Sequence, residues 1–145
     1  HLARVMVERG YVTTVREAFD RYLSPGRPGY VERFKLGPID AVKEILKAGG
    51  VPVLAHPGLI GRDDLIPQLV AAGLRGIEAY HPDHDSGQSN RYRALGEQMG
   101  LIVTGGSDCH GPQGNLHGSM GQVRMPYEVV ESMKREIRSL RGALA

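Results

Sequence analysis

The chain has 145 residues, of which 41% are apolar and 23% are charged, so it is long enough and apolar enough for one domain with a core. Its 18 basic and 16 acidic side chains give a net charge of +2, which implies no strong field and is compatible with an anionic substrate without requiring one. No apolar run approaches the roughly 20 residues that span a bilayer, so no membrane contact is expected. The single cysteine, Cys109, excludes an intrachain disulfide. Without a signal-peptide pattern, such a chain is expected in the cytoplasm.

The sequence predicts a helix that includes the first residues of the chain. His1 stands where a methionine is expected, and residues 2–6 place apolar side chains on one helical face. We therefore expect the chain to be a fragment of a longer protein. A second helix is predicted at Thr14 and Glu17, which have the spacing of a capping box. A turn-rich break then leads into an extended or irregular stretch over residues 30–36.

From residue 38 onward, apolar stripes of helical period alternate with short apolar runs. Helices are predicted around residues 39–46, 65–70, 92–99 and 129–140, and strands over residues 51–55, 76–80 and 101–105. Short apolar strands joined by single helices predict parallel pairing with right-handed crossovers. Three such units do not close a barrel, so the chain forms either a small open sheet or part of a larger α/β barrel. The fragment interpretation favours the larger barrel.

Histidine and aspartate gather where these predicted strands end. His56 follows the first strand, while Asp108 and His110 follow the third within a glycine-flanked loop. The carboxyl ends of parallel strands share the face on which α/β proteins build their sites. Asp108 and His110 are two residues apart, which puts both side chains on one side of an extended backbone. We therefore predict that these three residues bind a divalent metal.

Nitrogen and oxygen ligands together suit zinc, manganese or iron, and the spacing does not choose among them. The alternative is that Ser107 and Asp108 only cap the turn that follows the third strand. Glu78, inside the second strand, either pairs with a neighbouring cation or supports the metal ligands from behind. His84 is a candidate for contact with substrate or metal, and His81 a weaker one, since both could be ordinary exposed loop residues.

Two further residues near the third strand have plainer interpretations. Cys109 should point away from the predicted ligands that flank it, and nothing in the sequence supplies the base and electropositive pocket that a nucleophilic cysteine needs. His117 lies in a glycine-rich stretch that reads as a flexible connector. Neither residue is therefore assigned to the predicted site.

The strand-end motifs resemble those of the PHP family (polymerase and histidinol phosphatase) of metal-dependent phosphoesterases. The likeness is to the branch of bacterial nucleotide phosphatases and RNA 5′-end exonucleases. It rests on the order and spacing of motifs across nearly the whole chain, at residues 1–4, 17–23, 55–58, 76–80 with His84, and 105–111. The family implies a distorted (β/α)7 barrel with two or three divalent metals, often manganese, iron or zinc. Residues 37–145 would be its C-terminal βα units, and residues 1–36 a helical insertion over the active-site mouth.

The resemblance also implies roles for individual residues. His56, Asp108 and His110 would be metal ligands, and the metals would bind phosphate and activate water for attack at phosphorus. The substrate would be a nucleotide or an oligoribonucleotide. Its phosphate would be held by His1 and by basic residues of the insertion, which are Arg27, Arg33 and Lys35.

The departure from the family is large. Its N-terminal His-x-His pair, and the further ligands that follow that pair, are absent from this chain. We therefore expect little or no activity from the chain alone, and self-association through exposed strand edges. The alternative to an enzyme is a metal- or nucleotide-binding regulatory module without turnover, which the incomplete ligand set favours. A small open-sheet domain with incidental histidines is a third hypothesis.

Overall fold

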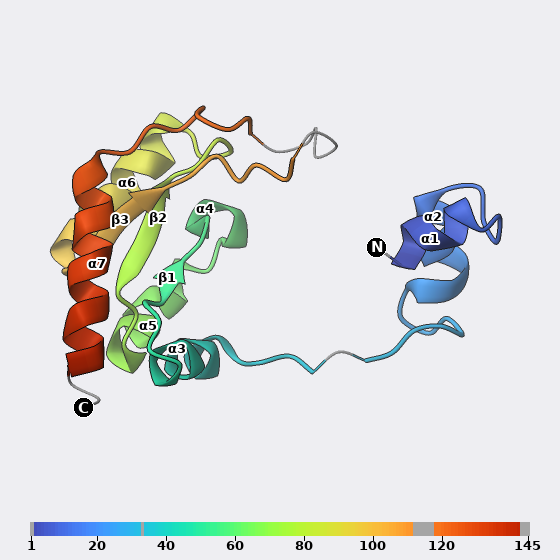
Figure 1. The fold of residues 1–145 in the computed structure, drawn as a ribbon, viewed down its shortest axis with the longest axis horizontal. Helices are drawn as coiled ribbons and strands as arrows, with labels where there is room; N and C mark the ends of the chain where they lie inside the picture. Colours follow the sequence, from blue (N-terminus) through green and yellow to red (C-terminus); the bar gives the residue numbers. More distant parts are fainter. Residues whose placement is uncertain (1, 33, 112–117, 143–145) are drawn as a thin grey trace. The chain divides into compact units, whose positions relative to one another are not determined.

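The chain forms two compact units, His1–Leu36 and Gly37–Ala145, in a computed structural model that describes residues 2–32, 34–111 and 118–142 (Figure 1). The predicted substrate contacts His1 and Arg33, and the predicted connector residue His117, lie outside the described residues. Among the helices that are described, none combines the length and the apolar composition that crossing a bilayer requires.

The first unit is helical and has a small core. It contains α1 (Leu2–Glu8), α2 (Val15–Ala18) and the π-helical turn η1 (Phe19–Leu23), packed around Ala3, Val12 and Ala18. The start of α2 differs in one respect from a full capping box. The Thr14 hydroxyl accepts a hydrogen bond from the Glu17 N–H at 3.0 Å, as expected. The Glu17 carboxylate, however, accepts from the N–H and hydroxyl of Thr13, at 2.8 and 2.7 Å, so the reciprocal bond has moved back by one residue.

The second unit is a three-stranded parallel sheet with helices around it. The strands pair in the order β1-β2-β3, and both pairs are parallel, which confirms the predicted pairing. The first strand is shorter than predicted, and the short helix after it was not predicted. In chain order the elements are α3 (Pro38–Lys47), β1 (Val53–Leu54), α4 (Pro57–Ile60), η2 (Asp63–Leu65), α5 (Ile66–Ala72), β2 (Gly76–Tyr80), α6 (Ser86–Gln98), β3 (Ile102–Gly105) and α7 (Tyr127–Gly142).

Helix α6 begins with a complete capping box, immediately after the loop that follows β2. The Asp85 carboxylate accepts from the Gln88 N–H at 2.7 Å, and the Gln88 side chain accepts from the Asp85 N–H at 3.0 Å. These reciprocal bonds satisfy two backbone donors that a helix start would otherwise leave unpaired. The five residues 81–85 therefore form a tight connection between β2 and α6.

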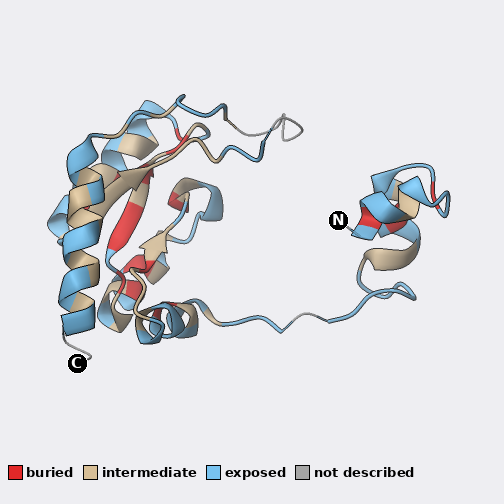
Figure 2. Ribbon diagram, viewed as in Figure 1, coloured by how far each residue is buried: buried red, intermediate tan, exposed pale blue. Residues whose placement is uncertain are grey.

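The core is centred on β2, where Ile77 and Ala79 are fully buried, and Figure 2 shows buried residues concentrated along β2 and α5. Helix α6 packs unusually close to the sheet at Gly96. A Cβ at this position would lie 2.8 Å from Ile77 Cγ2 and 2.9 Å from Val103 Cγ2. Because side chains alternate along a strand and Ile77 faces α6, Glu78 points to the opposite face of the sheet.

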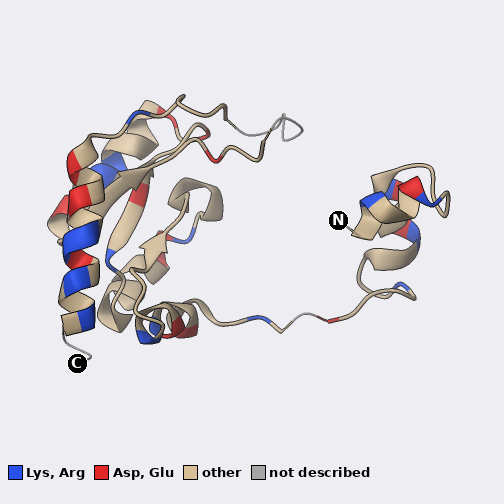
Figure 3. Cartoon of the chain, in the orientation of Figure 1, with Lys and Arg blue, Asp and Glu red and all other residues tan. Residues whose placement is uncertain are grey.

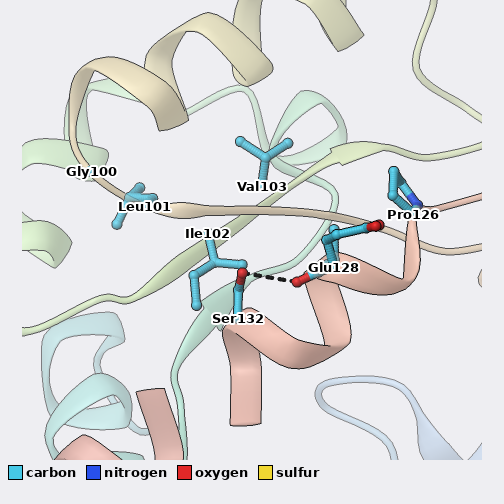
Figure 4. A pocket seen from close by; sticks show the side chains of 8 residues that line it. Gly100, Leu101, Ile102, Val103, Pro126, Glu128 and Ser132 are labelled. Atoms are coloured by element: carbon cyan, nitrogen blue, oxygen red, sulfur yellow. Dashed lines mark hydrogen bonds between the residues drawn. The ribbon is translucent and has the colours of Figure 1, made fainter. Parts of the chain in front are cut away.

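Helix α7 lies along β3 and leaves a shallow groove between them (Figure 4). Ile102 points toward α7, while Val103 points to the other face of the strand. Charged residues run along α7, but Glu128 is the one ionisable side chain among the described residues that line the groove (Figure 3). The groove therefore offers no set of metal ligands, and the predicted ligands lie instead in the loops at the carboxyl ends of the strands.

Candidate metal centre

His56 occupies a strained backbone position between β1 and α4. Its φ and ψ of 31° and 57° are left-handed, and Pro57 then begins α4. Asp108, after β3, also has a positive φ, of 48°, and these two are the non-glycine residues with positive φ in the described part of the chain. Such conformations are costly for residues with a side chain and cluster at functional sites. Both residues are predicted metal ligands.

Glu78 holds the strained turn at His56 in place. Its Oε2 accepts a hydrogen bond from the His56 N–H at 2.8 Å across the β1–β2 pair. Gly106 lies beside the same carboxylate, and a Cβ there would be 3.3 Å from Glu78 Oε1. The hydrogen bond from the His56 N–H to Glu78 can orient a metal ligand without competing for it, because it engages the His56 backbone and leaves the imidazole to other partners.

His81 contacts several members of the strand-end cluster, although the sequence made it a weaker candidate than His84. Its side chain is only 1% exposed, and its Nε2 lies 3.6 Å from Asp108 Oδ2. Its ring centroid is 5.5 Å from that of His56 and 5.4 Å from that of His84. His81 therefore links the loop after β1 to the loop after β3.

Asp108 and His110 contact each other within the loop after β3. His110 Nδ1 donates a hydrogen bond to the Asp108 carbonyl at 2.7 Å and lies 3.9 Å from Asp108 Oδ1. Because a carbonyl oxygen can only accept, Nδ1 carries the proton and the neutral ring has its lone pair on Nε2. Metal-binding histidines are commonly oriented in this way, by a bond from the other ring nitrogen.

The three predicted ligands thus follow the ends of β1 and β3; His81 connects His56 with Asp108, and His110 contacts Asp108. His56 Nδ1 is buried and lacks a hydrogen-bond partner among the described residues, which is costly unless a further group binds it. An imidazole nitrogen of this kind, with a carboxylate and a second imidazole, fits a divalent transition metal. Within the described residues, however, no three His, Cys, Asp or Glu side chains are arranged closely enough to hold a cation. A metal would need further ligands or a closer approach of these loops.

His84 connects the segments after β1 and β2 through hydrogen bonds. This geometry does not favour its predicted contact with substrate. The residue is 8% exposed. Its Nδ1 donates to the Ala79 carbonyl at 2.9 Å, and its Nε2 accepts from the Gly58 N–H at 3.1 Å. Tyr92 packs on the ring, with centroids 5.4 Å apart. Both ring nitrogens are therefore engaged with backbone groups of the protein.

The basic residues predicted to hold phosphate belong to the first unit. Lys35 lines a pocket of that unit together with Arg4, Phe19 and Tyr30. Arg27 is exposed, and its N–H donates to the Ser24 carbonyl at 3.0 Å in the turn after η1. Cationic and aromatic side chains together can bind a nucleotide through its phosphate and its base. Contact of Arg27 and Lys35 with substrate stays a prediction.

Comparison with curated proteins finds relatives that hydrolyse phosphoester bonds. A 3′,5′-nucleoside bisphosphate phosphatase of Chromobacterium violaceum is 39% identical over 117 residues, which are 77% of this chain and 41% of the relative. A phosphoribosyl 1,2-cyclic phosphate 1,2-diphosphodiesterase of Eggerthella lenta is 47% identical over 77 residues, 53% of this chain and 29% of the relative. A 5′-3′ exoribonuclease Rnm of Salmonella typhimurium is 32% identical over 124 residues, covering 77% and 40%. The chain thus spans between 29% and 41% of the length of these relatives.

Among solved structures, a protein from Bifidobacterium adolescentis assigned to the metal-dependent phosphoesterases superposes with a TM-score of 0.70 at 26% identity. The match covers 92% of this chain and 48% of that protein. No protein-family model matches the sequence. The curated relatives and this structure agree on one kind of chemistry, and each is matched over only part of its length.

Proposed function

We propose that this chain belongs to the PHP-type metal-dependent phosphoesterases and contributes part of a divalent-metal centre that hydrolyses phosphoester bonds in nucleotides or short RNA. The observation that supports the proposal is that His81 contacts both His56 and Asp108, two predicted ligands that each have a left-handed backbone. The activities named for the relatives are the source of the substrate class.

His56, Asp108 and His110 would hold the metal, which would be manganese, iron or zinc. A bound cation would polarise a phosphoryl oxygen and activate water for attack at phosphorus. The protein's own part is to keep the ligands in place. Glu78 fixes the His56 backbone, the Asp108 carbonyl orients the His110 ring, and burial excludes water around His81. Two or three metals, as the family implies, would need ligands beyond these.

The remaining predicted features belong to the same proposal. Residues 37–145 would be the C-terminal βα units of a (β/α)7 barrel, and residues 1–36 an insertion that carries Arg27 and Lys35 to the substrate phosphate. An edge strand such as β1 presents unpaired backbone groups, so self-association of the chain is expected and can be checked by light scattering. A cytoplasmic location is expected as well.

The test is made on a form that includes any sequence flanking residues 1–145. Elemental analysis and phosphate release from a nucleoside 3′,5′-bisphosphate and a short 5′-phosphorylated oligoribonucleotide are measured for the wild type and for Asp108→Asn and His56→Ala. We expect both variants to lose metal and to lower turnover by at least about 100-fold. Asp40→Asn, on an exposed position of α3, is the matched control and should keep both. Full metal content and full turnover in Asp108→Asn would contradict the proposal.

A second candidate function is metal or nucleotide binding without turnover. It is favoured by the finding that no trio of potential ligands in the described residues is close enough to hold a cation. The same experiment separates the two candidates. Metal that binds through Asp108 with no release of phosphate from either substrate would favour the binding module.

A further inference from the structure

His81 is a buried histidine whose Nε2 has no hydrogen-bond partner among the described residues. Its side chain is 1% exposed, and its ring contacts the rings of both His56 and His84. Nε2 is buried and finds no hydrogen-bond partner in the part of the chain that the structure describes. The carboxylate oxygen nearest to Nε2 is Asp108 Oδ2, at 3.6 Å, which is just beyond hydrogen-bond distance.

The other ring nitrogen of His81 determines what Nε2 can do. His81 Nδ1 accepts a hydrogen bond from the Asp83 N–H at 3.1 Å. A ring nitrogen that accepts carries no proton, so in the neutral imidazole the proton is on Nε2. His110 has the opposite arrangement, since its Nδ1 donates to the Asp108 carbonyl. The lone pair that a metal needs is therefore on Nε2 of His110 and absent from Nε2 of His81.

We propose that His81 is a positioning residue that donates its Nε2–H to Asp108 Oδ2, and that it does not bind the metal. A buried N–H without a partner is unfavourable, so a small closure of the 3.6 Å gap would be favoured once Asp108 is held in place. The bond would fix the orientation of the carboxylate on a residue whose backbone is already strained, with φ of 48°. This role rests on the proposed function, but the tautomer on which it depends does not.

The first experiment measures the tautomer of each histidine in the 145-residue chain by long-range ¹H–¹⁵N correlation NMR. We expect the proton of neutral His81 on Nε2, with a bare Nδ1, and the reverse in His110. A proton on Nδ1 of His81 overturns the inference. Zinc is then added. Coordination shifts at His56 and His110 but not at His81 support it, and a coordination shift at a His81 nitrogen overturns it. If zinc shifts no histidine, the proposed metal centre fails in this chain, and the inference is decided by the tautomer.

The second experiment compares His81→Gln with His81→Leu by zinc titration calorimetry on the form that includes flanking sequence. The glutamine amide can place an N–H close to where Nε2 stands, while leucine removes the donor. We expect His81→Gln to keep the zinc Kd within about threefold, and His81→Leu to weaken binding by about 10–100-fold. Loss of zinc by His81→Gln as severe as in Asp108→Asn would make His81 a ligand and overturn the inference. An unchanged Kd in His81→Leu would also overturn it.

Discussion

Replacing Glu78 by alanine tests how the strained turn at His56 is held. The substitution removes the acceptor of the 2.8 Å hydrogen bond from the His56 N–H, which is partly buried. A buried donor left without a partner costs about 1–3 kcal/mol, and a bond to a charged acceptor is worth about 1.5–3 kcal/mol. We expect the free energy of unfolding to fall by about 2 kcal/mol. With an m-value of about 2 kcal/mol/M, the urea midpoint falls by ~1 M.

Three measurements make this prediction specific to the turn. Glu78→Gln keeps a carbonyl oxygen as acceptor and should lose less than about 1 kcal/mol. Hydrogen exchange at the His56 amide should accelerate in Glu78→Ala more than at amides of α7, because the bond is local. Glu97→Ala, which removes an exposed glutamate paired with Arg93 on α6, is the control and should change stability by no more than about 0.5 kcal/mol. An unchanged midpoint and an unchanged His56 amide in Glu78→Ala would refute the reasoning.

Three further perturbations follow from the packing and the titrating groups. Gly96→Ala gains about 1 kcal/mol of helix propensity, but its methyl group would lie 2.8 Å from a core side chain. Urea unfolding should therefore show a net loss of about 1–2 kcal/mol in the free energy of unfolding. Gly142→Ala, whose methyl group meets nothing within 4 Å, should show no loss. Burial, with a hydrogen bond to Asp63, raises the pKa of Tyr92 above 10.0. The stabilisation of the fold by the neutral Tyr92 side chain is therefore present below pH 10 and is lost as pH rises through the folded pKa. Thermal unfolding of Tyr92→Phe should lack this alkaline loss of stability. Hydrogen bonds from the side chain and backbone of Thr13, and from Arg21, lower the pKa of Glu17 from 4.5 to about 2. The stabilisation of α2 by the Glu17 carboxylate is therefore present above pH 4.5 and is lost as pH falls toward 2. In Glu17→Gln, the NMR signals of α2 should show no such acid transition.

The parallel sheet could be predicted from the sequence because the helix and strand periods alternate regularly after residue 38. Strand β2 matches its predicted bounds of 76–80. Strand β1 keeps only two of the five predicted residues, Val53 and Leu54, and Pro52 before them has no N–H to donate to a strand ladder. Helix α4 was missed because Pro57 and Gly58 read as breakers, although proline at the first helical position is favourable.

The rank order of His81 and His84 could not be predicted, because spacing does not say which side chain of a loop turns inward. The pairing of β2 with β3 shifts register between Glu78 and Tyr80, so β2 contains one extra residue there. A bulge of this kind redirects the side chains that follow it, and it is common next to functional sites. The bond from the Asp83 N–H then fixes the His81 ring. Both causes depend on contacts with distant segments that no local pattern contains.

The glycine after His56 and Pro57 has a packing role that connects the loops after β1 and β2. A Cβ on Gly58 would lie 2.8 Å from both Cδ2 and Nε2 of His84, and 2.9 Å from the Gln88 side-chain nitrogen. Only a residue without a side chain lets the Gly58 N–H reach His84 Nε2, whose ring is fixed in turn by the Ala79 carbonyl. Gln88 belongs to the capping box of α6. The residue that looks like a simple helix breaker therefore ties the turn at His56 to the strand and the helix behind it.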